Sequence, residues 1–236
     1  MNSFPGAILR KVTFNLNAVR LGAPLYFFTP KKLINCYTTT SISASIPKKS
    51  FANKLAEKFS FFSISKTRLK ANSYLLFESV ADQLNYADIF KRLNLPDTFY
   101  SWFVVTELYI WMLMVRYMAE GEDGKVVRNY VLQALWADVH ERSKKLTPTG
   151  LVGIKSQIVD LSGQLNAALI GYDEGLNSSD VVLAGALWRR LYQQKSVDPE
   201  HLDMLVKYIR RQIKIMDCWT HKELFHKVSV RWEPIK

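Results

Sequence analysis

Two adjacent carboxylates between two glycines are the first candidates for chemistry, in the stretch "AALIGYDEGLNSSD". Asp173 and Glu174 could form a catalytic acid pair, a metal loop or part of a helix-to-helix corner. A calcium loop of the EF-hand type needs alternating oxygen ligands and a glutamate at the twelfth position, and this stretch misses that spacing. Adjacent acids on a turn diverge into solvent, which leaves nothing to separate their pKa values. The pattern favours a corner, in which Gly175 ends one helix with a left-handed cap and Asn177 starts the next.

The histidines and cysteines form no metal or redox pattern that we can identify. Cys218, His221 and His226 lie close in sequence, but their spacing fits no zinc signature and at least one more ligand would be needed. Surface or packing roles are the alternative for these residues. The sequence also contains no P-loop, HExxH, nucleophile-elbow or dinucleotide fingerprint. We therefore predict a protein without enzymatic activity, with no catalytic residues, no metal site and no cofactor.

The positive charge is concentrated in the N-terminal quarter of the chain. The 236 residues carry a formal net charge of +11, yet no Asp or Glu precedes Glu57 and eight Lys or Arg do. A basic, acid-free, Ser/Thr-rich N-terminus is typical of a mitochondrial transit peptide, which we place at 1–50 as a disordered segment. A merely disordered basic tail is the alternative. The remaining chain carries 24 basic and 21 acidic residues, so we expect no direct DNA binding.

The most apolar stretch, "WFVVTELYIWMLMVRYM", predicts a buried core helix and not a membrane span. Glu107 and Arg116 interrupt it, and the run between them is too short to cross a bilayer. Apolar residues recur at helical spacing through most of the chain after residue 50, and strand signals are poor. The expected helices are 51–62, 66–84, 86–95, 98–120, 123–145, 151–171, 177–192 and 199–217.

Helix starts are marked by residues that commonly cap helices. We predict N-caps at Asp97, Asp123, Asn177 and Asp198, the last followed by Pro199 at the first helical position. The predicted fold is all-α: one multi-helix domain at 51–225 behind the targeting segment. Residues 226–236 form a C-terminal tail that can add a short extended segment.

A basic stripe lies on the last long helix, opposite its apolar face. Lys207, Arg210, Arg211 and Lys214 recur at i, i+3, i+4 and i+7. Such a stripe is either a solvated face or an electrostatic patch for a ribosome, an anionic membrane or an acidic partner. The dense apolar residues between 99 and 118 belong mainly to the core, but one face could hold a partner helix or a hydrophobic client.

Four stretches together resemble one family: "LPDTFYSWF", "ALIGYDEGLNSSD", "AGALWRRLY" and "DPEHLDMLVKYIRRQI". In this order and spacing they are similar to the ubiquinol–cytochrome c chaperone family over roughly residues 66–220. The stretch "KFSFFSISKTRLK" departs from the family pattern. The resemblance implies a non-enzymatic assembly factor on the matrix side of the mitochondrial inner membrane. It also implies a small partner, complex III assembly factor 2, binding near the mitochondrial ribosome exit, and newly made cytochrome b held for delivery into complex III.

The family stretches supply our candidate contact residues for partner or client. These residues could equally be folding determinants. They are Asp97, Phe99, Trp102, Tyr172, Asp173, Glu174, Trp188 and Arg189. Two other functions stay open: an RNA-binding mitochondrial translation activator, which needs a broad basic surface, and a lipid- or quinone-handling protein, which needs an enclosed apolar cavity. Peripheral contact with the inner membrane is compatible with the assembly function.

Overall fold

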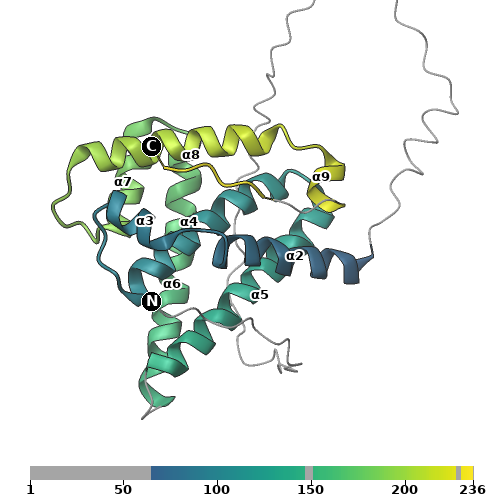
Figure 1. The fold of residues 1–236 in the computed structure, drawn as a ribbon, viewed down its shortest axis with the longest axis horizontal. Coiled ribbons are helices and arrows are strands. Elements are labelled where there is room, and N and C mark those ends of the chain that lie inside the picture. The colour runs from purple at the N-terminus through teal and green to yellow at the C-terminus, as the bar shows by residue number, and fades with distance from the viewer. Residues whose placement is uncertain (1–64, 147–150, 227–229, 236) are drawn as a thin grey trace, which may run out of the picture.

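A computed structural model describes residues 65–146, 151–226 and 230–235 of the chain (Figure 1). The predicted transit peptide and the predicted helix at 51–62 lie outside these ranges. Within them the structure is helical and contains no strand, which confirms the all-α prediction. The helices are α2 (Lys66–Ala81), α3 (Tyr86–Arg92), α4 (Phe99–Met118), α5 (Gly121–Leu146), α6 (Leu151–Leu176), α7 (Asp180–Leu191), α8 (Pro199–Asp217) and α9 (His221–Phe225).

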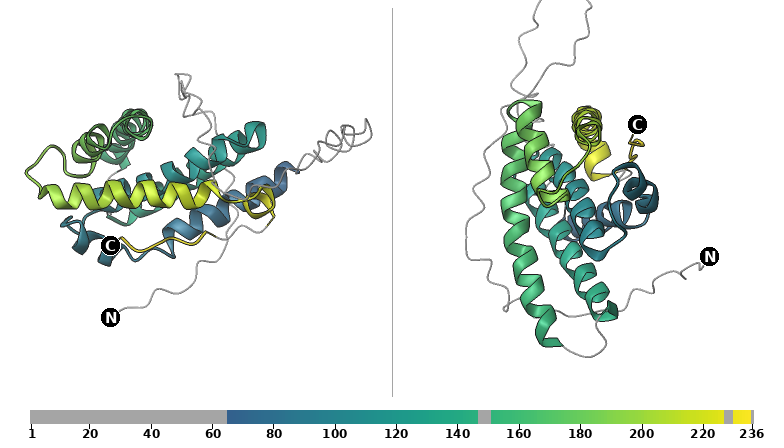
Figure 2. Two further views of the ribbon diagram at one scale, coloured as in Figure 1. Left: turned by 90° about the horizontal axis from the view of Figure 1, so that it is seen from above. Right: turned by 90° about the vertical axis from the view of Figure 1, so that its left-hand side faces the viewer.

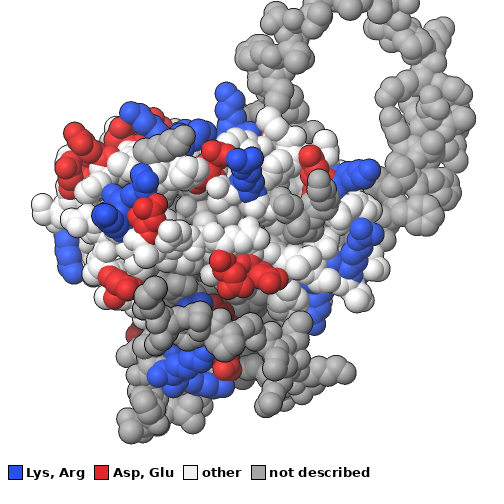
Figure 3. All heavy atoms as spheres, in the orientation of Figure 1, with Lys and Arg blue, Asp and Glu red and all other residues white. Residues whose placement is uncertain are grey.

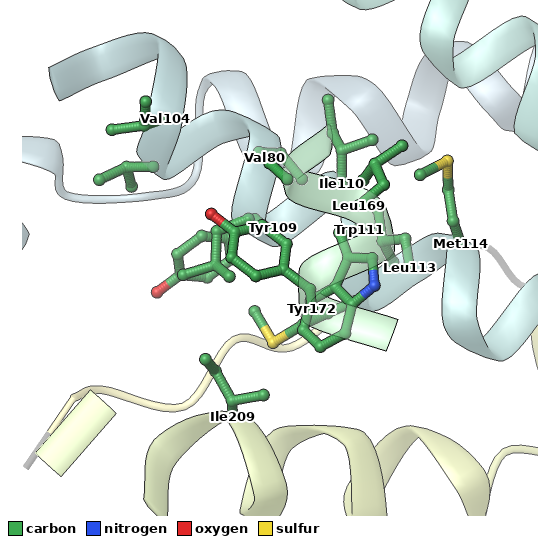
Figure 4. Packing of buried hydrophobic residues seen from close by; sticks show 14 of the residues in the cluster. Val80, Val104, Tyr109, Ile110, Trp111, Leu113, Met114, Leu169, Tyr172 and Ile209 are labelled. Atoms are coloured by element: carbon green, nitrogen blue, oxygen red, sulfur yellow. The ribbon is translucent and has the colours of Figure 1, made fainter. Parts of the chain in front are cut away.

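The centre of the fold is α4, which is buried on nearly every side. Phe103, Val104 and Trp111 expose none of their surface, and the helix contacts α2, α5, α7 and α8. A helix that is apolar around its whole circumference can be stable only when other elements surround it. Figure 4 shows side chains of α2, α4, α6 and α8 meeting around Tyr109 and Trp111. None of the described helices is long and apolar enough to cross a membrane.

Five of the other helices lie around α4, as two packed pairs and one long single helix that we call the strap. One pair is α2 with α5, and the other is α6 with α7, which run antiparallel as a hairpin. The strap is α8, which contacts both α4 and α7 and runs along the upper edge of the molecule in Figure 1. The right-hand view in Figure 2 shows α5 and α6 extending together beyond the rest of the fold.

Local capping chemistry sets most helix starts. Asp198 accepts a hydrogen bond from the Glu200 amide at 2.9 Å and Pro199 occupies the first turn, as predicted. At α4 the predicted cap was wrong by one residue. Thr98 is the N-cap, because its backbone is extended and its hydroxyl accepts from the Ser101 amide at 3.2 Å.

The turn between α4 and α5 is tighter than predicted. The sequence predicted a helix ending at residue 120 and a second one capped by Asp123, but α5 already begins at Gly121. Gly121 has a φ of +70°, which lets the chain reverse there at little cost. Gly124 lies within the helix, where a Cβ would stand only 1.8 Å from the Tyr117 carbonyl oxygen. Gly121 is therefore needed for the conformation of the turn, and Gly124 for the close approach of α5 to the end of α4.

The corner between α6 and α7 also differs from the prediction. The α6 helix continues past Gly171 to Leu176, so Gly175 is helical and does not form a left-handed cap. A Cβ on Gly175 would lie 2.5 Å from the Leu183 Cα, so glycine permits the two helices to touch. Asn177 does not start α7; its side-chain amide donates to the Asp173 carbonyl at 2.8 Å and closes the end of α6. Ser179 is the N-cap residue of α7.

The C-terminal segment packs onto the core without forming a strand. Val230 and Ile235 are buried, and the Trp232 ring lies edge-on to Tyr109 at 4.8 Å between centroids. The Glu233 amide donates to the Gln212 side chain at 3.2 Å. Residues 230–235 thus cover the seam between α4 and α8.

Side chains of α2 and α4 hold the region around α9 by its backbone carbonyls. Asn72 donates to the Phe225 carbonyl at 2.7 Å, and the Tyr117 hydroxyl donates to the Leu224 carbonyl at 2.8 Å. Arg116 pairs with Glu120 at 2.6 Å and also donates to the carbonyls of Met216 in α8 and Trp219 just beyond it, so this largely buried cation is well satisfied. Distant parts of the sequence are joined by these bonds.

Candidate functional site

An open groove of about 810 Å³ lies where the start of α4, the middle of α6 and the end of α7 meet. Grooves of this size lined mainly by apolar groups are the usual sites of ligand or peptide binding. It is lined by Phe99, Tyr100, Asp160, Leu161, Gln164, Ala167, Ala168, Gly171, Ala186, Arg189, Arg190, Gln193 and Gln194.

Small side chains on α6 and α7 leave open space in the middle of the groove. Ala167, Ala168 and Gly171 come from α6 and Ala186 from α7. A Cβ on Gly171 would lie 3.5 Å from that of Ala186, so the two helices pack closely here. An aromatic wall stands opposite, where the half-buried Phe99 stacks on Trp102 with ring centroids 5.4 Å apart.

A buried ion pair underlies the groove. The side chains of Glu107 on α4 and Arg190 on α7 are 0% and 8% exposed. The Arg190 Nη2 lies 2.6 Å from Oε2 of Glu107 and its Nε lies 2.9 Å from Oε1, a bidentate arrangement. The Arg190 Nη1 also donates to Gln164 at 2.8 Å, and the Tyr172 hydroxyl lies 3.4 Å from the carboxylate. These contacts tie α4, α6 and α7 together.

The buried position changes the acid–base properties of this cluster. Burial raises the pKa of Glu107 to about 7, although hydrogen bonds and charge from Arg190 act to lower it. Burial opposes the charge of Arg190, but the hydrogen bonds and charge of Glu107 outweigh it and raise the Arg190 pKa. Burial also raises the pKa of Tyr172 well above its ordinary value, so its hydroxyl stays protonated and donates.

Arg189 and Arg190 both line the groove, but they differ in exposure and in their partners. It is exposed at the groove, and within the described ranges no ion pair to it is formed. Its Nη1 lies 3.4 Å from the position of a Cβ on Gly185, so the side chain folds back along α7. Among the residues that the structure describes, Arg189 is therefore the groove cation for which no ion pair is formed.

The rim beyond α7 is built from two residues in left-handed conformation. Gln193 and Gln194 have φ values of 52° and 61°, which cost free energy for residues with a side chain. The Trp188 indole donates to the Lys195 carbonyl at 2.7 Å and holds this turn closed. Trp188 therefore shapes the rim and does not line the groove.

The structure brings together only some of the predicted contact residues. Phe99 and Arg189 line the groove, and Trp102 lies buried behind Phe99 with the Arg142 guanidinium 4.2 Å above its ring. Asp97 is exposed in the loop before α4. Of these four residues, only Phe99 and Arg189 line the groove.

The remaining predicted contacts lie on the last turns of α6, where they have different surroundings. Tyr172 is completely buried against Trp111, with ring centroids 5.1 Å apart. Asp173 accepts a hydrogen bond from the Trp111 indole at 2.8 Å, and burial raises its pKa. Glu174 is exposed. The two adjacent acids thus serve different ends: Asp173 braces α6 against α4, and Glu174 faces solvent.

The predicted basic stripe is largely engaged within the protein. Lys207 pairs with Asp203 at 2.7 Å, and Arg211 donates to the Pro234 carbonyl at 3.3 Å. Arg210 binds Asp180 at 2.7 Å and also donates to carbonyls of the α6–α7 corner, including Leu176 at 2.9 Å. The fourth member, Lys214, is exposed. Arg210 therefore holds the α6–α7 corner together. Basic and acidic side chains are interspersed on the face drawn in Figure 3.

Sequence reasoning missed Glu107, Arg190 and Gln164 as a connected group. A signal was present, because Glu107 is a carboxylate inside an otherwise apolar helix and such residues are rarely buried unless paired. Its partner is 83 positions away and only the fold identifies it. Over the described parts of the chain, no cluster of three or more His, Cys, Asp or Glu is placed to hold a metal ion.

Comparisons with known proteins agree with the resemblance noted in the sequence. A family model described as ubiquinol-cytochrome C chaperone matches residues 91–232. A Drosophila melanogaster protein named ubiquinol-cytochrome c reductase complex assembly factor 1 is 45% identical over 76% of this chain and 71% of its own length. The human protein of the same name is 34% identical over 72% of this chain and 57% of its own length.

More distant similarity extends to yeast and to a bacterial structure. The Saccharomyces cerevisiae protein CBP3, mitochondrial, is 33% identical over 57% of this chain and 41% of its own length. The crystal structure of the Cbp3 homolog from Brucella abortus superposes with a TM-score of 0.61 at 15% identity, covering 78% of this chain and 97% of that one. The bacterial protein therefore shares the fold.

Proposed function

Because the chain belongs to the ubiquinol–cytochrome c chaperone family, we propose that it is a non-enzymatic chaperone for the assembly of mitochondrial respiratory complex III. The names of its relatives support this assignment, and the acid-free basic N-terminus supports a mitochondrial location. The proposed site of action is the matrix side of the inner membrane, with peripheral contact to the membrane.

The client in this proposal is newly made cytochrome b, and the small partner is complex III assembly factor 2. The observation that carries the proposal is the open groove with its small-residue floor and aromatic wall. Covering an apolar segment of a membrane protein before insertion lowers the population that can aggregate. Phe99 and Arg189 are the proposed contacts among the residues selected from sequence, whereas Tyr172 and Asp173 support the fold beneath them.

The basic stripe is proposed as a secondary surface for the mitochondrial ribosome or anionic lipid. Lys207 and Lys214 are exposed and could meet such a surface, but Arg210 is needed by the α6–α7 corner. Reversing the charge of both lysines tests this without disturbing the corner. If Lys207→Glu with Lys214→Glu leaves ribosome and membrane association unchanged, the stripe is a solvated face.

No observation favours the two other functions considered. An RNA-binding activator should present a broad basic surface, but residues 57–236 carry 24 basic and 21 acidic side chains. A lipid- or quinone-handling protein needs an enclosed apolar cavity, and the groove on α4, α6 and α7 is open.

Affinity purification from mitochondria tests the proposed function. The tagged chain should recover cytochrome b and a small soluble protein, and mock-purified mitochondria without the tag supply the control. Depletion of the chain should lower the amount of assembled complex III. The proposal fails if neither protein is recovered and complex III stays normal after depletion.

A further inference from the structure

We infer that the groove receives a single apolar α-helix of the client, and that this helix places a carboxylate against Arg189. The inference rests on the proposed chaperone function and specifies what the groove recognises. It is drawn from three features of the groove: its small-residue ridge, its aromatic wall and its one cation without a partner.

The ridge is a helix-packing surface that continues beyond its packed part. Gly175 and Gly171 on α6 allow α7 to approach, since their Cβ positions lie 2.5 Å from the Leu183 Cα and 3.5 Å from the Ala186 Cβ. The same four-residue spacing continues to Ala167 and Gly163. Ridges at this spacing are what a second helix packs against. Yet a Cβ on Gly163 would meet nothing within 4 Å, and Ala167 is exposed.

Apolar side chains flank the open part of this ridge. Leu161, on the same helix, is half-buried and lines the groove beside the small residues. Phe99 and Tyr100 form the opposite wall. A helix lying between them would cover apolar surface on both sides, which a flat contact would not achieve.

The charges in the groove define the chemistry of the occupant. Arg190 is neutralised by Glu107, so the uncompensated charges are Arg189 and, on α6, Asp160. Asp160 precedes Ala167 by about two helical turns, roughly 10 Å along α6. A carboxylate on the bound helix is therefore attracted at the Arg189 end and repelled at the Asp160 end, and this difference sets the position of the carboxylate along the groove.

Two matched peptides test the inference. The probe is a 21-residue Leu/Ala helix with one central Glu and terminal Lys pairs for solubility, and its control carries Gln in place of the Glu. Fluorescence anisotropy measures binding to the purified full chain. We expect the Glu peptide to bind about fivefold more tightly than the Gln peptide, the value of one partly exposed charge pair. Arg189→Gln should abolish that preference.

Two alanine variants test the location. Ala167→Phe fills the groove and should weaken binding of both peptides about tenfold or more. Ala137→Phe adds the same bulk at an exposed position of α5 outside the groove and should leave binding unchanged. Circular dichroism confirms that both variants fold.

Three results would overturn the inference. Equal binding of the Glu and Gln peptides would show that a carboxylate is not recognised. Unchanged binding to Ala167→Phe would show that the peptide does not bind in the groove. A concentration-dependent dimer that Ala167→Phe dissolves would assign the groove to a second copy of the chain. None of these results affects recovery of cytochrome b by the wild-type protein, and loss of that recovery would sink the proposed function while leaving peptide binding intact.

Discussion

Removal of the Arg190 charge should be among the most damaging single changes to this fold. Arg190→Met leaves Glu107 without its cation in a position where the carboxylate side chain is 0% exposed. Breaking a buried ion pair from one side costs about 3–5 kcal/mol in the free energy of unfolding. Urea denaturation followed by circular dichroism measures this loss.

The neighbouring arginine supplies a matched control. Arg189→Met makes the same chemical change one residue earlier, at an exposed position, and should alter the unfolding free energy by less than about 0.5 kcal/mol. The double variant Glu107→Leu with Arg190→Met removes both charges. It should be within about 1 kcal/mol of the wild type or more stable, since the desolvation cost disappears with the pair.

The pH dependence gives a second signature of the same pair. Burial raises the pKa of Glu107 from 4.5 to about 7, so the folded protein holds this proton more strongly than the unfolded chain. The contribution of this group to stability is therefore full below pH 4.5 and is lost as the pH rises through 7. Without Arg190 the folded pKa is higher still, because its hydrogen bonds and charge lower the pKa.

The loss in free energy of unfolding caused by Arg190→Met should consequently grow above pH 7. It should grow by about 1.4 kcal/mol per pH unit until the pH reaches the higher Glu107 pKa of the folded variant. Unfolding curves at pH 5, 7 and 8.5 reveal this growth. A penalty below about 1 kcal/mol at pH 8.5, or one equal to that of Arg189→Met, would refute the role given to the pair.

Two further predictions concern the α6–α7 hairpin. Gly175→Ala should destabilise the protein by about 1–3 kcal/mol in urea denaturation, because the new Cβ meets the Leu183 backbone, whereas Gly163→Ala in open space should be neutral or stabilising by up to about 1 kcal/mol. A gain in stability in both variants would show that helix propensity and not close packing governs Gly175. Arg210→Gln should speed hydrogen exchange at the corner amides, and Lys214→Gln should not; equal protection in both variants would contradict this role of Arg210.

The helices could be predicted from the sequence where residues within the same turn determine them. The start of α8 at Asp198 and Pro199 was correct, because capping requires only residues within one turn. The end of α6 was wrong, because Gly171 and Gly175 look like helix terminators until their neighbour is known. These two glycines permit close contact with α7, and a single sequence does not show which helix will lie against them.

In the candidate site too, local features could be predicted from the sequence and contacts between distant residues could not. Two adjacent arginines, Arg189 and Arg190, look equivalent in the sequence, yet one faces the groove and the other is buried beneath it. The hairpin orientation decides between them, and it depends on contacts with α4 and α8. Phe99 and Arg189 could be selected from the family stretches, but Gln164 and Arg190, which also line the groove, were not.

The order in which the chain is made gives the central position of α4 a further consequence. Its last covering elements, α8 and residues 230–235, follow α4 by about eighty residues or more in the sequence. A growing or unfolded chain must therefore carry one of its most apolar helices without cover until those elements are available. Asn72 and Tyr117 complete the closure only when they reach the carbonyls of Phe225 and Leu224. The apolar surface of α4 is therefore covered late in the synthesis of the chain, when α8 and residues 230–235 have been made.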